Sequence, residues 1–195
     1  MDLDALAAMA AADETHRYEL SADGALSIMP AGDPERALTV SRLVCWLMDQ
    51  GLSPEQVVIS CAIKVAAAVR VPDVTVWAKG QPPRSVQAGY AATDGLLQIV
   101  EVVAPGTEVF DQVGRMGEYA AAGILRYWIV EEDGTVLRHA LDVRGRQYVP
   151  DPAGPLLLAD LLSSGPDTFE DVIGVRMPGS AARRSELSGP GQPIR

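Results

Sequence analysis

The hydrophobic pattern is strongest over residues 95–130, where it predicts a strand, a loop, a helix and a second strand. Residues 96–103 form an apolar, β-branched run with the length of a strand buried on both faces. A helix is expected at residues 110–122, because Gly123 is a favourable C-terminal stop. Residues 125–130 form another apolar strand, so this segment predicts a β–α–β unit with a right-handed connection.

Two further elements are expected nearer the N-terminus. Residues 17–20 and 25–29 predict a β-hairpin around an Asp-Gly turn. A helix is expected between Asp33-Pro34, a favourable start, and Gly51, a favourable stop. The core-facing stripe of this helix is predicted to contain Ala37, Val40, Val44 and Leu47, flanked by Leu43 and Trp46.

The other segments predict short strands, a loop and two terminal regions. Residues 56–63 and 65–69 predict one or two strands, joined or kinked near Lys64. Residues 70–77 follow, with Pro72 marking the beginning or the edge of a strand, and an exposed hairpin is expected at 135–143 and 147–149. Residues 79–94 are expected to form a polar loop, either a mobile lid or an insertion. The predicted division is an N-terminal extension at 1–14, one domain at 15–175 and a disordered tail at 176–195.

Composition narrows the class of protein. The chain has 195 residues and a net charge of −10, which argues against tight nonspecific binding of nucleic acid but not against a groove that is locally basic or uses a metal. The sequence has no apolar run of membrane-spanning length and no basic signal region, so a cytoplasmic location and no membrane association are expected. Cys45 and Cys61 are expected to be buried free thiols, and His139 a surface residue.

Acidic residues inside apolar segments are the candidate chemical groups. Glu101 lies within a predicted buried strand, where either a metal ion or a buried ion pair would compensate its charge. Asp73 stands at the entrance of another strand and is either a turn residue or a second metal ligand. Asp111, Arg115 and Tyr119 recur every four residues, so they share a helix face that is either solvated or turned toward Glu101. Val113, Met116 and Ala120 are expected to pack on the sheet.

The order and spacing of several motifs resemble the Uma-two family of "putative restriction endonucleases", within the PD-(D/E)XK nuclease superfamily. The resemblance covers about residues 15–150 and is carried by Arg17-Tyr18-Glu19-Leu20, Pro72-Asp73-Val74, residues 99–105, Asp111, Arg115, Tyr119, Ala122-Gly123 and residues 127–130. It implies an α/β (α+β) fold with a restriction-endonuclease-like mixed central sheet flanked by helices. N-terminal and C-terminal β-hairpins complete the expected fold.

The resemblance also implies roles for individual residues. Asp73, Glu101 and the backbone carbonyl of Val102 would bind Mg²⁺ or Mn²⁺, and Glu19 would add a carboxylate. Arg115 stands where the family commonly has lysine. An arginine can stabilise phosphate charge but cannot serve as a base. Asp111 and Tyr119 would support the site. The motif lysine and the family's usual serine are also replaced, by Val103 and Ala104.

The expected function is hydrolysis of phosphodiester bonds in nucleic acid, with DNA as the expected substrate, by a metal-dependent endonuclease. The alternative is a catalytically impaired family member that acts as a binding or regulatory module. A third interpretation is an unrelated α+β protein in which Glu101 is only a structural ion-pair partner. The exposed hairpin and the apolar residues 156–162 favour a homodimer.

Overall fold

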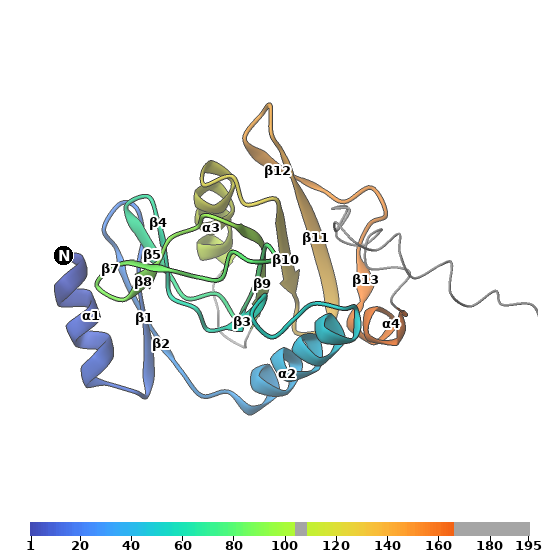
Figure 1. Ribbon diagram of the computed structural model, residues 1–195, viewed down its shortest axis with the longest axis horizontal. Coiled ribbons are helices and arrows are strands. Elements are labelled where there is room, and N and C mark those ends of the chain that lie inside the picture. The colour runs from blue at the N-terminus through green and yellow to red at the C-terminus, as the bar shows by residue number, and fades with distance from the viewer. Residues whose placement is uncertain (104–108, 166–195) are drawn as a thin grey trace, which may run out of the picture.

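The computed structural model describes residues 1–103 and 109–165, and the side chains of residues 109–112 lie outside this description. The described chain forms two mixed β-sheets flanked by helices (Figure 1). The predicted mixed α+β fold and both terminal hairpins are confirmed, with the strands divided between two sheets.

The larger sheet has seven strands, with the order β12-β11-β10-β9-β6-β3 and β13 paired to β11. Its strands are β3 (Val57–Ile59), β6 (Val74–Trp77), β9 (Leu96–Val102), β10 (Arg126–Val130), β11 (Thr135–Asp142), β12 (Gln147–Pro150) and β13 (Leu156–Leu157). Strands β9 and β10 are parallel and are connected through α3 (Val109–Ala121), as the predicted β–α–β unit requires. Strand β6 pairs with β9 in the antiparallel direction.

The second sheet has six strands, in the order β2-β1-β5-β4-β8-β7. They are β1 (His16–Leu20), β2 (Leu26–Pro30), β4 (Ile63–Val65), β5 (Ala68–Arg70), β7 (Ser85–Gln87) and β8 (Tyr90–Ala91). Helix α1 (Leu3–Ala12) lies against this sheet, where Leu6 is buried with Leu20, Val69 and Tyr90. This sheet carries two charged residues, Glu19 and Arg70, that are fully or almost fully buried.

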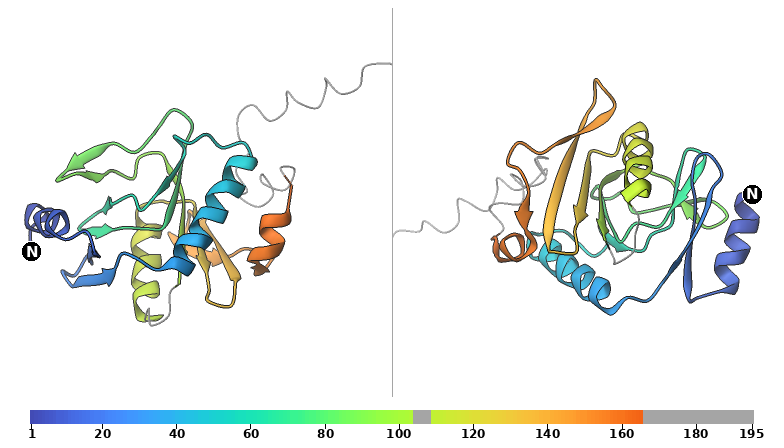
Figure 2. Two further views of the ribbon diagram at one scale, coloured as in Figure 1. Left: turned by 90° about the horizontal axis from the view of Figure 1, so that it is seen from below. Right: turned by 180° about the vertical axis from the view of Figure 1, so that it is seen from behind.

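The two faces of the larger sheet belong to different cores. Helices α2 (Pro34–Asp49) and α4 (Leu158–Ser163) cover one face, where Leu43 and Leu47 pack against Val100 and Trp128. On the opposite face, Tyr119 of α3 packs with residues of the larger sheet and with residues of the smaller sheet. The views in Figure 2 show α3 and α2 on opposite sides of the larger sheet. The buried charged residues Glu19, Arg70, Glu101 and Arg115 lie between the two sheets and α3.

Several local expectations are wrong. The predicted loop at residues 79–94 contains the β7–β8 hairpin, and residues 56–70 form three short strands instead of one or two. Backbone turns with positive φ at Ser60 and Ala66 separate those strands. Strands of two or three residues contain too few positions for a periodic pattern to mark their ends.

Some expectations of burial are also wrong. Val113 is 71% exposed, whereas Ala120 is buried and Met116 packs against the core, as expected. Ala37 and Cys45 are exposed on α2, whose buried side is centred on Leu43, Trp46 and Leu47. Both cysteines are free thiols, as expected. His139 is half-buried, because its ring packs beside that of Tyr127, its cross-strand partner on β10.

Candidate functional site

Asp73, the residue just before β6, lies beside Glu101 of the neighbouring strand β9. The antiparallel register of β6 and β9 pairs Val74 with Val100, so one step further places Asp73 opposite Glu101. Side chains of directly opposed residues point to the same face of a sheet. For Glu101 this is the face of Ile99, which packs in the core beneath α3. The expectation that the two acids stand on neighbouring segments is therefore confirmed.

Four hydrogen bonds from charged and backbone donors surround the Asp73 carboxylate. Arg36 donates from Nε to Oδ1 and from Nη2 to Oδ2, both at 2.8 Å. Arg17 donates from Nη2 to Oδ1 at 3.0 Å, and the backbone N–H of Val102 donates to Oδ2 at 2.8 Å. Asp73 is thus buried as an ion pair with two arginines. Because the N–H and C=O of one strand residue point to the same side, the carbonyl of Val102 also faces the Asp73 side of β9.

Helix α3 supplies both side-chain partners of Glu101. Arg115 Nη1 lies 3.0 Å from Glu101 Oε1, and the Tyr119 hydroxyl donates to the same oxygen at 2.9 Å. The polar face of the helix therefore turns toward Glu101. Burial raises the pKa of Glu101 from 4.5 to about 6, Arg115 opposes this shift, and the charges of Glu19 and Asp73 reinforce it. The pKa of Tyr119 is raised well above 10.0, chiefly by burial.

Arg115 also reaches the smaller sheet. Its Nη2 lies 2.9 Å from Glu19 Oε2, and the same carboxylate accepts from Arg70 at 3.2 Å and from the backbone N–H of Val71 at 2.9 Å. Arg70 in turn pairs with Glu118, through Nε at 2.7 Å and Nη2 at 3.0 Å. Burial lowers the pKa of Arg70, but these carboxylates outweigh it and hold the pKa above its usual value.

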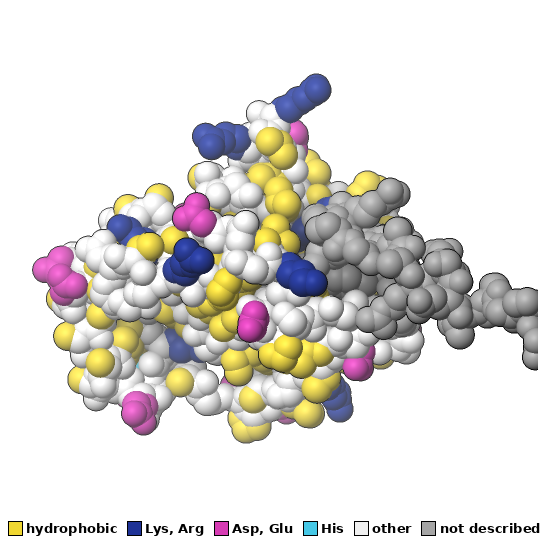
Figure 3. All heavy atoms as spheres, viewed as in Figure 1, with side chains coloured by type: hydrophobic (Ala, Val, Ile, Leu, Met, Phe, Trp, Pro, Cys, Tyr) yellow, Lys and Arg dark blue, Asp and Glu magenta, His cyan; other side chains and the backbone are white. Residues whose placement is uncertain are grey.

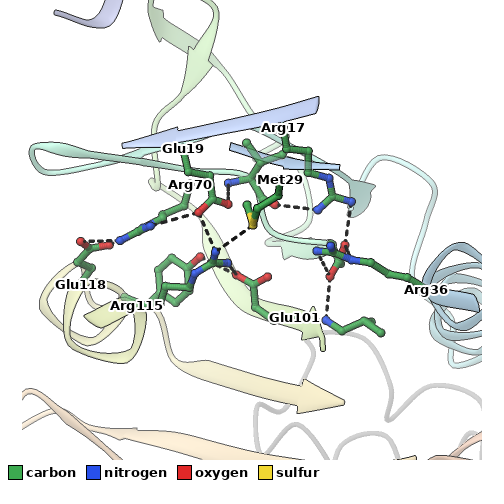
Figure 4. A network of polar contacts seen from close by, with 12 residues as sticks. Arg17, Glu19, Met29, Arg36, Arg70, Glu101, Arg115 and Glu118 are labelled. Atoms are coloured by element: carbon green, nitrogen blue, oxygen red, sulfur yellow. Dashed lines mark hydrogen bonds and ion pairs between the residues drawn. The ribbon is translucent and has the colours of Figure 1, made fainter. Parts of the chain in front are cut away.

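Together these residues form two groups, which we call the inner chain and the outer cluster. The inner chain alternates in sign through Glu118, Arg70, Glu19, Arg115 and Glu101 (Figure 4). The outer cluster consists of Asp73, Arg17 and Arg36. By formal charge the inner chain sums to −1 and the outer cluster to +1. The site is therefore neutral as a whole, with its surplus positive charge beside Asp73.

The structure brings five of the six side chains expected at the site into this region: Asp73, Glu101, Arg115, Glu19 and Tyr119. The sixth, Asp111, has a side chain outside the described residues. Sequence reasoning missed Arg36, Arg70 and Glu118, and it quoted Arg17 without assigning it a role. The available signal was the excess of arginine over lysine in the sequence.

The carboxylate oxygens of Asp73 and Glu101 fit a magnesium ion that takes only a few of its ligands from the protein. No group of three or more His, Cys, Asp or Glu side chains in the described residues is arranged to hold a metal. Mg²⁺, however, is commonly bound by one or two carboxylates, with water and substrate phosphate completing its shell. The opposed pair Asp73 and Glu101 meets that need, provided that the Arg36 fork leaves the Asp73 carboxylate.

Comparison with known proteins agrees with this arrangement. A family model described as "Uma2: Putative restriction endonuclease" matches residues 3–172. The chain belongs to the Uma2 family. Because the Uma2 model matches most of the chain, the interpretation as an unrelated α+β protein is wrong. The ion pair that this interpretation expected for Glu101 is nevertheless present.

The Uma2 fold is also found in a solved structure. A chain from Anabaena variabilis, described as "a putative nuclease belonging to DUF820", superposes with a TM-score of 0.57 at 16% sequence identity. The match covers 77% of this chain and 92% of the other. None of the curated proteins matches the sequence. Family and fold together indicate a nuclease.

One face of the molecule carries both signs of charge. On the face in Figure 3, Lys and Arg side chains are scattered among acidic ones and do not gather into a band. The helices of the described chain are all too short or too polar to cross a membrane.

Proposed function

We propose that this Uma2 protein is a metal-dependent endonuclease that hydrolyses phosphodiester bonds of nucleic acid, with DNA as the expected substrate. The observation that carries the proposal is a pair of buried carboxylates in a nuclease fold: Asp73, the residue before β6, and Glu101 on the adjacent strand β9. These residues, with the carbonyl of Val102, would hold Mg²⁺ or Mn²⁺. When bound, such an ion supplies an activated water and neutralises phosphate charge.

The neighbouring residues prepare the two carboxylates for this role. Arg115 and Tyr119 both contact Oε1 of Glu101 and so fix the orientation of the carboxyl group. Arg115 is itself held on the other side by Glu19, which leaves its guanidinium in a single position. We therefore infer that Arg115 is a positioning residue. Its contact with a phosphate, expected from the sequence, stays a prediction.

The test is cleavage of plasmid and single-stranded DNA with Mg²⁺ or Mn²⁺. We expect wild type to cleave, and Asp73→Asn and Glu101→Gln to lose cleavage, because each change removes a carboxylate from the metal site. Asp49→Asn is the matched control, since Asp49 is an exposed acid at the end of α2 and outside the two charged groups. Cleavage that survives in both site variants would overturn the assignment.

A second candidate is a family member that binds nucleic acid or a partner without efficient hydrolysis. The observation that favours it is that the buried carboxylates Glu19, Asp73 and Glu101 are all paired with arginines. Arg115→Lys separates the two candidates, because it restores the amine common in the family. Metal-dependent cleavage by wild type supports the nuclease. Cleavage gained only in Arg115→Lys, or absent from both proteins despite metal binding, supports the impaired module. A homodimer stays a prediction that sedimentation would test.

A further inference from the structure

The Arg36 fork on Asp73 is the strongest feature that the proposed function leaves unexplained. Its two hydrogen bonds of 2.8 Å match the two oxygens of the carboxylate. A guanidinium fork has the same geometric fit to the oxygens of a phosphate. Within the described residues, the side chain of Arg36 makes polar contacts with Asp73 alone. Arg36 therefore has a single anionic partner, which is also a proposed metal ligand.

The position of Arg36 favours an exchange of that partner. The side chains of Arg36 and Arg17 are each 13% exposed, whereas Asp73 is fully buried, so the arginines lie on the solvent side of the carboxylate. A divalent cation and a guanidinium cannot both occupy the same carboxylate oxygens. Once the cation binds Asp73, Arg36 would be a partly buried positive charge without a counter-ion, which is unfavourable.

We infer that Arg36 is a phosphate-binding residue that Asp73 holds while no divalent cation is bound, and that it transfers to a phosphodiester oxygen when the cation takes Asp73. The ligand class is thus a phosphate ester of nucleic acid, bound together with the metal. The inference rests on the proposed metal site. It explains why the surplus positive charge of the region lies in the outer cluster and not among the deeply buried residues.

The inference predicts two effects of opposite sign for Arg36→Gln. Removing the competing guanidinium should tighten Mg²⁺ binding about tenfold, since a hydrogen bond to a charged group commonly corresponds to a factor of about ten or more. The same change should weaken Mg²⁺-dependent binding of deoxythymidine 5′-monophosphate by at least about tenfold. A purely structural role would weaken both. The variant should fold, because Asp73 keeps Arg17 and the N–H of Val102 as partners.

Both affinities are measured by isothermal titration calorimetry on the full chain, with folding checked by thermal denaturation. Arg42→Gln is the matched control, since it removes the same charge from an exposed position on the same helix. Arg36→Lys is the second variant, to be used if Arg36→Gln unfolds, because it keeps the charge but loses the two-pronged contact; the same two directions of change are expected, with smaller size.

The outcomes distinguish this inference from the proposed function. Tighter Mg²⁺ binding with weaker nucleotide binding supports the exchange, as does Mg²⁺ binding that appears only in Arg36→Gln. Mg²⁺ binding by wild type that is unchanged or weaker in Arg36→Gln overturns the exchange and leaves the metal site intact. No binding of Mg²⁺ by wild type or variant overturns both.

Discussion

Replacing Glu101 by glutamine should stabilise the protein at neutral pH. Glu101 is almost fully buried, and its raised pKa means that the ionised form is less favourable in this site than in water, even with Arg115 beside it. Glutamine has nearly the same shape and carries no charge. It can still accept a hydrogen bond from Tyr119. The substitution therefore removes the cost of ionisation while it keeps the packing.

The magnitude follows from the shift in pKa. Glu101 has an ordinary pKa of 4.5 and a pKa of about 6 in the folded protein. Because the folded state holds this proton more tightly, the associated stability is fully present below pH 4.5 and is lost as the pH rises through about 6. At about 1.4 kcal/mol for each pKa unit, the loss is about 2 kcal/mol. Glutamine never ionises, so Glu101→Gln avoids this loss.

Urea denaturation at pH 4 and pH 7.5, with a chelator present, measures the effect. Relative to wild type, the free energy of unfolding of Glu101→Gln should rise by about 2 kcal/mol between the two pH values. Glu118→Gln is the control. It breaks the pair of hydrogen bonds to Arg70 and should destabilise the protein by about 1.5–3 kcal/mol at pH 7.5. A Glu101→Gln effect that is equal at both pH values would refute the reasoning.

Three other predictions test the site and the fold. Mg²⁺ should raise the melting temperature of wild type but not of Asp73→Asn in thermal denaturation, because only a folded metal site gains stability from the ion; equal shifts would contradict this. Arg115→Ala should lower the free energy of unfolding, measured in urea, by about 3–5 kcal/mol, because the buried carboxylates of Glu19 and Glu101 each lose an ion-pair partner. A loss below about 1 kcal/mol would show that the pairing matters little. Gly95→Ala should destabilise more than Gly24→Ala by about 1 kcal/mol or more. Both glycines have positive φ, but only the new Cβ at Gly95 would lie 2.5 Å from Gln81 Oε1, and equal losses would exclude this clash.

Local pattern was sufficient to predict the β9–α3–β10 unit and the helix face directed at Glu101. Strand β9 has seven residues and α3 has thirteen, which is long enough for periodicity and end signals to act together. The spacing of Arg115 and Tyr119 places both on one side of α3, and the adjacent strand then leaves Glu101 within their reach. Both features therefore depend on residues that are close together in the sequence.

The arginine partners of Asp73 could not be predicted in this way. Arg36 lies 37 residues away in the first turn of α2, and Arg17 lies 56 residues away on β1. Nothing local to either residue distinguishes it from a solvated surface arginine. Their pairing depends on how α2 and the smaller sheet pack against the larger one, which is a property of the tertiary structure. The division of the strands between two sheets was missed for the same reason.

The alternating inner chain of charges has a consequence for synthesis of the protein on the ribosome. Its links join residues far apart in sequence: 51 residues separate Glu19 from Arg70, and a hydrogen bond at 96 residues' separation ties Ala22 to Glu118. Glu19 and Arg70 therefore emerge long before α3 can supply Arg115 and Glu118. Because burying Glu19 and Arg70 without these further partners is unfavourable, we expect a nascent chain that ends before α3 to remain open and sensitive to protease. Docking of α3 would then complete the packing between the two sheets in one late, cooperative step.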